Sequence, residues 1–187
     1  MEGLIKEIYE RRAYRAFSEK KIPEETVQRL MTAATYAPSC KNSQPWRLLV
    51  AKSDESLKKI HDSIMGGNYW VKKAPVVALI ATRYEFDGRL DDQRDYALFD
   101  CGLAVENLLL QAVREGLHAH PIAGYEPVKV KESFNIPMDY ILVTLVAIGY
   151  PGDDSHLQGM HSELEHSPRE RKPEGEVISY DAWGFDT

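Results

Sequence analysis

One segment of this 187-residue chain would form a helix with apolar side chains on almost every face. The spacing predicts a helix from Asp91 to Glu115, and Gly116 follows as a favourable residue for its end. Its second half, Leu103 to Val113, carries apolar side chains nearly all round. A helix of this kind must be covered by neighbouring elements, so we expect the fold to be built around it.

The remaining apolar runs have the length and spacing of short helices and strands. The predicted strands are Arg47–Ala51, Pro75–Thr82, His118–Ile122 and Tyr140–Ile148. The other predicted helices begin near Leu4, at Pro23, after the capping residue Ser53 (with Gly66-Gly67 ending that helix) and at Pro127. Because helices and strands do not alternate regularly, the predicted fold class is α+β. No GxGxxG follows a strand and no GxxxxGK[ST] occurs, which argues against a Rossmann or P-loop nucleotide site.

Length, charge and cysteine content narrow the class of protein further. A chain of this size predicts one domain, residues 1–187. Its net charge of −6 argues against a general nucleic-acid binder, because phosphate neutralisation needs a basic surface. Cys40 and Cys101 have no metal-ligand spacing, the start of the chain lacks the apolar core of a signal peptide, and the apolar run Pro75–Ala81 is too short to cross a membrane. We therefore expect a cytoplasmic protein with reduced thiols.

The last part of the chain differs in composition from the rest. Residues 153–176 are polar and charged, and an apolar group of Val177, Ile178, Tyr180 and Trp183 follows. Such a tail is either disordered or an arm that lies on another surface. The aromatic residues near its end favour the arm.

Two clusters of basic residues lie at opposite ends of this acidic chain. Arg11, Arg12 and Arg15 fall within about one helical turn, and Arg169-Glu170-Arg171-Lys172 lies in the tail. Each cluster could be an ordinary solvated charge run, with Glu7 offsetting the first one. Alternatively, both could meet on one phosphate, since the planar fork of arginine holds two oxygens at once.

A loop rich in amide and hydroxyl groups, Pro38–Trp46, separates a predicted helix from a predicted strand. Its Asn and Gln side chains are ordinary in a turn, but they could also read the edge of a flat heterocycle. Cys40 could act as a nucleophile, although no base lies near it in the sequence. His118 and His120 would share one face of a strand, yet two imidazoles do not complete a metal site, so no metal is predicted.

Read together, four of these motifs resemble the nitroreductase family of flavin enzymes. RRAYRAF at residues 11–17 looks like that family's RRSxRxF, and APSCKNSQPW at residues 37–46 is similar to its APSxxNxQPW. HPIAGYE at residues 120–126 follows the long helix, where the family has a PIxG-type turn, and PRERKP at residues 168–173 resembles its late basic segment. The resemblance runs from about residue 5 to residue 183.

The resemblance implies that FMN is the cofactor and assigns roles by position. The implied cofactor-binding residues are Arg11, Arg12, Ala13, Arg15, Pro38, Ser39, Cys40, Asn42, Pro121, Ala123, Gly124, Arg169 and Arg171. The arginines from both chain ends would hold the phosphate, except Arg15, which would face the N1/C2=O edge of the ring. The turn at residues 121–124 would present backbone N–H to N5, and the loop at residues 38–42 would come from the partner subunit. Ala13 replaces the usual serine, so one hydrogen bond to the cofactor is absent.

The resemblance also implies an architecture and a reaction. The expected fold is α+β, with a mixed, mostly antiparallel sheet flanked by helices and a C-terminal arm, residues 153–187, that packs on the partner of a homodimer. NAD(P)H would deliver hydride through FMN to a small acceptor such as a nitroaromatic or a quinone, in ping-pong turnover and without a catalytic side chain. Alternatives are an enone reductase, a dehalogenase-like member or a non-catalytic flavin-binding protein. Residues 66–90 match the family weakly and would line the substrate pocket.

Overall fold

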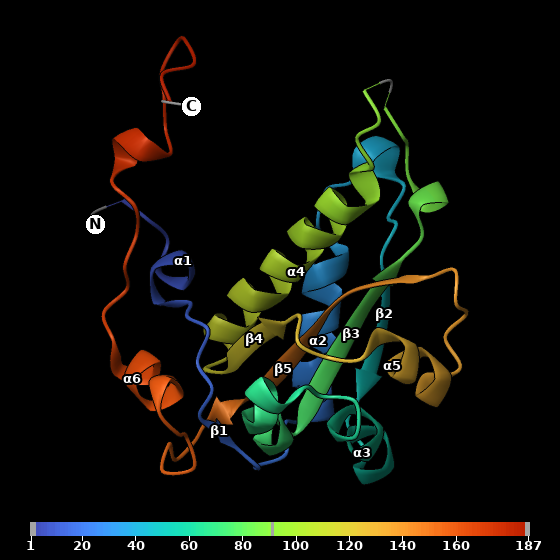
Figure 1. The fold of residues 1–187 in the computed structure, drawn as a ribbon, viewed down its shortest axis with the longest axis vertical. Helices are drawn as coiled ribbons and strands as arrows, with labels where there is room; N and C mark the ends of the chain where they lie inside the picture. The colour runs from blue at the N-terminus through green and yellow to red at the C-terminus, as the bar shows by residue number, and fades with distance from the viewer. Residues whose placement is uncertain (1–2, 91, 186–187) are drawn as a thin grey trace.

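The computed structural model describes residues 3–90 and 92–185, and its described strands form one antiparallel sheet (Figure 1). The long strand β5 (Ile141–Pro151) lies in the middle, between β3 (Val76–Thr82) and β4 (His118–Ile122). β2 (Arg47–Ala51) pairs with the outer edge of β3, and the short β1 (Phe17–Ser18) pairs with the end of β5. The four strands predicted from the sequence are confirmed, and β1 was not predicted.

Helices cover both faces of this sheet. The described helices are α1 (Lys6–Glu10), α2 (Glu24–Thr35), α3 (Asp54–His61), α4 (Tyr96–Arg114), α5 (Pro127–Phe134) and α6 (Met160–His166), with short 3₁₀ helices at Cys40–Asn42, Gly66–Lys73, Tyr84–Phe86 and Glu174–Glu176. α2 and α4 lie on one face, and α3, α5 and the 3₁₀ helix Gly66–Lys73 lie on the other. The α+β class is therefore confirmed, and α6 was not predicted.

The alternation along β3 explains the two-sided core. Every residue of this strand is buried. Val76, Ala78 and Ile80 pack with α2 and α4, whereas Val77 and Leu79 pack with α3, α5 and Trp70. Because successive strand residues point to opposite faces, a continuous apolar run is what a strand between two helical layers requires.

The central helix is well covered along its second half, but two apolar residues near its start are exposed. Ala104, Leu108 and Ala112 are fully buried against the sheet and α2, but Leu98 and Phe99 are exposed. These two residues precede the half predicted to be apolar all round; from Leu103 to Val113 every apolar side chain is buried or half-buried, as expected. The observed helix starts at Tyr96, and Asp91 lies outside the described residues. By length and composition, α4 is the one helix in the described part of the chain that could cross a membrane, yet here it is a core element of a packed fold.

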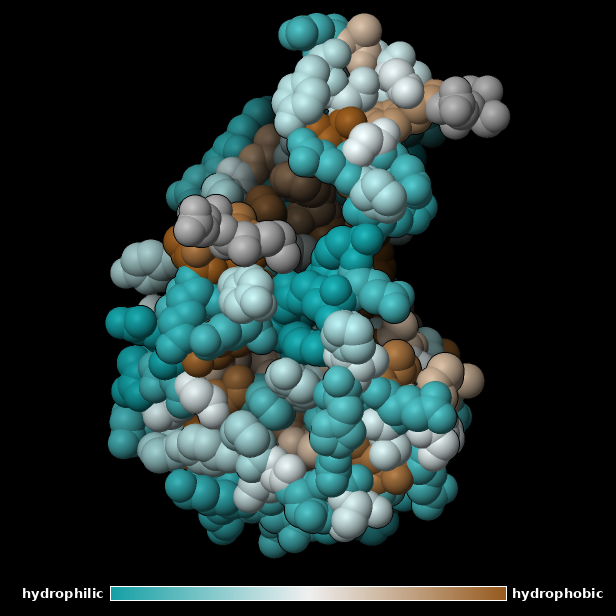
Figure 2. All heavy atoms as spheres, turned by 90° about the vertical axis from the view of Figure 1, so that its left-hand side faces the viewer, coloured by the Kyte–Doolittle hydropathy of each residue, from teal (hydrophilic) through white to brown (hydrophobic). Residues whose placement is uncertain are grey.

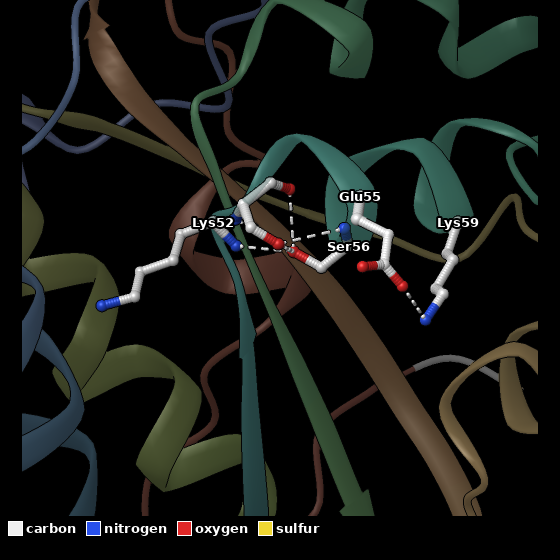
Figure 3. Close-up of polar contacts among 5 residues, drawn as sticks. Lys52, Glu55, Ser56 and Lys59 are labelled. Carbon is white, nitrogen blue, oxygen red and sulfur yellow. Dashed lines mark hydrogen bonds and ion pairs between the residues drawn. The ribbon is translucent and has the colours of Figure 1, made fainter.

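The start of α3 follows the chemistry expected of a helix cap (Figure 3). The Ser53 hydroxyl accepts a hydrogen bond from the Ser56 backbone N–H at 3.2 Å, and the Ser56 hydroxyl accepts one from the Ser53 N–H at 3.0 Å. Two donors that the first turn leaves free are thereby satisfied. Ser53 is confirmed as the cap, but α3 ends at His61, and Gly66-Gly67 opens the next 3₁₀ helix instead of closing α3.

A glycine directly after β5 packs closely against the backbone at residues 16–18. The Gly152 N–H donates to the Ala16 carbonyl at 3.0 Å, directly after β5. A Cβ at this position would lie 2.3 Å from the Phe17 carbonyl carbon and 2.4 Å from the Ser18 nitrogen, both backbone atoms. Backbone cannot move aside as a flexible side chain can, so only glycine permits this close approach. The C-terminal segment therefore starts beside the N-terminal one.

The segment after Gly152 is only partly packed on the rest of the chain. Leu157 and Glu165 are buried, and the Gln158 N–H donates to the Tyr69 hydroxyl at 2.8 Å. Farther along, Tyr180 and Trp183 are 75% and 81% exposed, and this end projects away from the sheet (Figure 1). Figure 2 shows the molecule from the left-hand side of Figure 1, with hydrophobic surface in the hollow beside the projecting end. Within one chain, the apolar tip lacks a covering surface.

Candidate functional site

Residues from both ends of the chain line one cavity. This cavity of about 390 Å³ is formed by the segment after α1 and the segment after α6. Its lining residues are Arg11, Arg12, Ala13, Tyr14, Arg15, Leu164, Ser167, Pro168, Arg169, Glu170 and Arg171. The structure thus brings together the two basic clusters, which lie more than 150 residues apart in the sequence. We call this the arginine cavity.

The positive charge of the arginine cavity is weakly compensated. Arg11 lies 3.8 Å from a Glu106 carboxylate oxygen, and among the described residues Arg12, Arg15, Arg169 and Arg171 form no ion pair with a carboxylate. Partial burial, together with the neighbouring guanidinium groups of Arg171, Arg11 and Arg12, lowers the pKa of Arg169. Like charges gathered in this way disfavour one another, so the site is suited to an anion.

A second cavity, of about 680 Å³, shares four of these five arginines. It is lined by Tyr9, Glu10, Arg11, Arg12, Tyr14, Val113, Gly116, Leu117, His118, Ala119, Pro151, Arg169 and Arg171. The arginine side chains therefore lie between a polar hollow and one that extends along the end of α4 and the start of β4. Volumes of this size are typical of sites for small molecules and cofactors.

Aromatic rings pack beside the arginine cavity along β4. Tyr14 stacks on His118 with ring centroids 4.2 Å apart, and Trp70 packs on His120 at 4.4 Å. The Arg15 guanidinium carbon lies 5.8 Å from the centre of the Trp70 ring. Its Nε is buried without a hydrogen-bond partner among the described residues. Arg15 thus retains a buried donor, and burial lowers its pKa.

The two histidines of β4 are packing residues in this structure. His120 is buried, and its Nδ1 lies 3.0 Å from the Tyr14 carbonyl oxygen. Burial lowers the pKa of His120 to about 4, so the ring is neutral at pH 7, and burial also lowers the pKa of His118. Within residues 3–90 and 92–185, no group of side chains could hold a metal ion.

Residues 121–124 include the last two residues of β4 and the turn that follows it. Pro121 pairs with Val146 of β5, and Ala123 is exposed. The Gly124 carbonyl accepts hydrogen bonds from the Met65 N–H at 3.1 Å and the Asn68 amide at 3.0 Å. Asn68 lies in the same 3₁₀ helix as Trp70, so one short element holds this turn and packs beside Arg15. A Cβ on Gly124 would lie 2.5 Å from the Asn68 amide nitrogen, so a side chain here would displace the Asn68 side chain from its hydrogen bond.

The loop at residues 38–44 lies at the other end of α4. The Cys40 N–H donates to the buried Asp100 carboxylate at 2.8 Å, in the second turn of that helix. The second cavity, which shares four arginines with the arginine cavity, touches α4 at Val113, and thirteen residues of α helix span about 20 Å. Within one chain, the structure therefore does not bring Pro38, Ser39, Cys40 and Asn42 to the arginine cavity.

The backbone of this loop is strained and held in place. Lys41, Asn42 and Gln44 have φ values of 52°, 58° and 49°, in the left-handed region that non-glycine residues rarely adopt. The Ser39 hydroxyl accepts from the Gln44 N–H at 3.0 Å, and the Gln44 amide donates to Asn42 Oδ1 at 3.2 Å. Strain that the surroundings impose in this way is typical of binding and catalytic segments.

Sequence reasoning missed two residues that shape the site. Glu165 accepts hydrogen bonds from the backbone N–H groups of Arg15 and Ala16, and Asn68 holds Gly124. Both contacts join residues far apart in the chain, and neither residue belongs to one of the four motifs. Trp70, within the segment 66–90 that would line the substrate pocket, is a core residue with 1% exposure.

Comparisons with known proteins agree on one family. The family model described as "Nitroreductase family" matches residues 8–68 and 65–150. A protein of Archaeoglobus fulgidus named "Putative NADH dehydrogenase/NAD(P)H nitroreductase" is 30% identical, over 82% of this chain and 88% of its own length. An FMN reductase of Bacillus subtilis is 25% identical, over 83% of this chain and 68% of its own length. A solved structure described as an oxidoreductase containing FMN has a TM-score of 0.86 and 30% identity, over 96% of this chain and 92% of that one. The chain belongs to the nitroreductase family.

Proposed function

We propose that this chain is an FMN-dependent oxidoreductase that oxidises NAD(P)H and reduces a small electron acceptor such as a nitroaromatic or a quinone. The observation that carries the proposal is the arginine cavity, in which five arginines from the two chain ends line one hollow. The FMN named for the similar solved structure and the NAD(P)H named for the Archaeoglobus relative support it.

The residues of the cavity fit the chemistry of FMN. A phosphate needs several N–H donors with fixed positive charge, and Arg11, Arg12, Arg169 and Arg171 supply them. Arg15, three residues after Arg12, offers a buried Nε donor that has no partner among the described residues, and the ring edge would lie there. Ala13 lines the cavity without a side-chain donor of its own.

Bound FMN would supply the redox chemistry by accepting a hydride and passing it on. The chain's own residues then have the tasks of binding and orientation. Arg15 provides a cation beside the ring, which favours its negatively charged form. The turn of Pro121, Ala123 and Gly124, fixed by Asn68, presents backbone to the same region, and no side chain need exchange a proton.

We further propose that two copies of the chain form each site. The strained loop at residues 38–44 lies about 20 Å along α4 from the point where the second cavity touches this helix, so a second subunit would have to bring the loop to the arginines. α4 also leaves a face uncovered, and with α1 and α2 it lines a groove of about 670 Å³. The exposed tip of the C-terminal arm offers an apolar surface for the partner.

The first prediction concerns cofactor content. The purified protein is expected to be yellow, with about one FMN per chain, and to bind FAD more weakly because the arginines surround a terminal phosphate. Anaerobic addition of NADH or NADPH is expected to bleach the flavin absorbance within the mixing time of a spectrophotometer. A colourless protein that takes up no FMN would contradict the proposal. A yellow protein that neither NADH nor NADPH bleaches would instead favour a flavin-binding protein without turnover.

The second prediction is kinetic. The sequence holds no second nucleotide-binding motif, so NAD(P)H and the acceptor are expected to use one site in turn. Hydride transfer needs the reacting atoms within about 3–3.5 Å, which two ligands cannot achieve on one face together. Initial rates at several fixed acceptor concentrations should give parallel double-reciprocal lines. Intersecting lines would show a ternary complex and exclude ping-pong turnover.

The nature of the acceptor and the location of the protein belong to the same proposal. An enone reductase or a dehalogenase-like enzyme is the alternative within the family, and a panel of nitroaromatic, quinone, enone and halogenated acceptors would separate them. We place the protein in the cytoplasm because both cysteines, Cys40 and Cys101, are unpaired. Cell fractionation would test this location.

A further inference from the structure

The segment that carries three of the cavity's arginines has no regular structure of its own. Residues 11–16 lie between α1 and β1 and belong to neither helix nor strand. Other parts of the chain supply most of the hydrogen bonds to its backbone. The Tyr14 carbonyl lies 3.0 Å from His120 Nδ1, and the Ala16 carbonyl accepts from the Gly152 N–H at 3.0 Å. The positions of Arg11, Arg12 and Arg15 therefore depend on contacts made from outside the segment.

One carboxylate satisfies two consecutive donors of this segment. Glu165 Oε2 accepts from the Arg15 N–H at 2.9 Å, and Glu165 Oε1 accepts from the Ala16 N–H at 3.0 Å. Glu165 is only 7% exposed, and it forms no ion pair with Lys, Arg or His in the described part of the chain. A buried carboxylate without such a partner is costly unless hydrogen bonds satisfy it. Its placement is thus specific to these two amides.

The C-terminal segment that carries Glu165 forms a second set of hydrogen bonds with the N-terminal part of the chain. Four residues after Glu165, the Arg169 guanidinium donates to the Ile8 carbonyl at 3.2 Å and also to the Arg11 carbonyl. Glu165 binds N–H groups at the far end of the segment, and Arg169 binds carbonyl groups at its near end. Both attachment points border the arginine cavity, since Arg15 and Arg169 are among its lining residues.

We infer that Glu165 is a positioning residue that holds the segment at residues 11–16 in the shape that binds phosphate. This inference rests on the proposed FMN site and adds a residue to it. Glu165 would not touch the ligand; it would fix the backbone that carries Arg11, Arg12 and Arg15, and anchor α6 so that Arg169 and Arg171 face them. Its loss should therefore weaken binding of the phosphate more than binding of the ring.

The test compares FMN with riboflavin, which lacks the phosphate. The variant is Glu165→Gln, which keeps the shape but turns one oxygen acceptor into a donor that faces a backbone N–H. The matched control is Glu163→Gln, the same change at an exposed position of the same helix. Fluorescence titrations of the apoprotein give both dissociation constants. In Glu165→Gln the preference for FMN over riboflavin should fall about tenfold, or 1.4 kcal/mol, and in the control it should not change.

Hydrogen exchange of the apoprotein provides a measurement that does not need flavin. The amides of Arg15 and Ala16 should exchange about tenfold faster in Glu165→Gln, because their hydrogen bonds to the carboxylate are weakened. The amides of β3 should exchange at an unchanged rate, because the rest of the fold is intact. Should Glu165→Gln fail to fold, Glu165→Asp, which retains the charge on a shorter side chain, replaces it in both measurements.

The outcomes separate the inference from the proposed function. An unchanged ratio of FMN to riboflavin affinity, with flavin bound by the wild type, would overturn the role of Glu165 and leave the flavin site standing. Equal losses for both ligands would indicate general destabilisation and would also overturn it. A wild type that binds neither FMN nor riboflavin would overturn the proposed function. Hydrogen exchange at Arg15 and Ala16 would then decide whether Glu165 holds the backbone of this segment.

Discussion

Arg12→Glu is expected to weaken FMN binding at least about tenfold, equivalent to 1.4 kcal/mol. Arg12 lines both cavities and forms no carboxylate ion pair among the described residues, so its charge is free to act on a ligand. Reversal removes one donor and places a carboxylate where a phosphate would lie, among guanidinium groups that already lower the pKa of Arg169. Fluorescence titration of the apoprotein with FMN measures the change.

Two further variants sharpen this measurement. Lys21→Glu makes the same change of charge at an exposed residue outside both cavities, and it should leave the affinity for FMN unaltered. Arg169→Glu should be at least as damaging as Arg12→Glu, because it also breaks the contacts with the Ile8 and Arg11 carbonyls. Unchanged affinity in both arginine variants would exclude the arginine cavity as the phosphate site.

The sequence predicted best those elements whose signals are local. β3 is a short run of β-branched and other apolar residues, and both α2 and α3 begin with favourable residues, so their existence follows from neighbouring positions. β1 has only two residues and exists because Gly152 lets it approach β5. α6 has a polar sequence and one buried carboxylate, and its reason for being there is a contact 150 residues away. Such contacts leave no periodic pattern.

For the candidate site, too, the sequence predicted the residues with local signals and missed those that depend on long-range contacts. The arginines could be named from the sequence because their positive charge is conspicuous in an acidic chain. The sequence could not show that Glu165 arranges them, since a glutamate in a polar tail resembles any solvated residue until its burial is known. Nor could spacing show that the loop at residues 38–44 lies at the other end of α4, because that separation depends on how a helix of 19 residues is placed.

Removal of residues 153–187 is expected to abolish FMN binding and to leave a monomer. The truncation deletes Arg169 and Arg171 from the arginine cavity and removes the carboxylate that fixes the Arg15 and Ala16 amides. It also deletes the exposed apolar tip, which we propose lies on the partner subunit. Sedimentation velocity and flavin absorbance of the full and truncated chains measure both effects, and the full chain should sediment as a dimer at micromolar concentration.

A shorter truncation, after Pro173, separates the two consequences. It keeps Glu165 and Arg171 but removes Val177, Tyr180 and Trp183, of which Trp183 is 81% exposed in the single chain. Interfaces of obligate dimers commonly bury more than about 2,000 Å², so loss of the tip should raise the dimer dissociation constant without destroying the arginine cavity. FMN affinity should then fall less than in the longer truncation, and it should recover at protein concentrations high enough to restore the dimer, because the loop at residues 38–44 would again come from the second subunit. A full-length chain that stays folded, flavin-loaded and monomeric at micromolar concentration would contradict the shared site. The strained backbone of residues 38–44 would then have to serve a function within one chain.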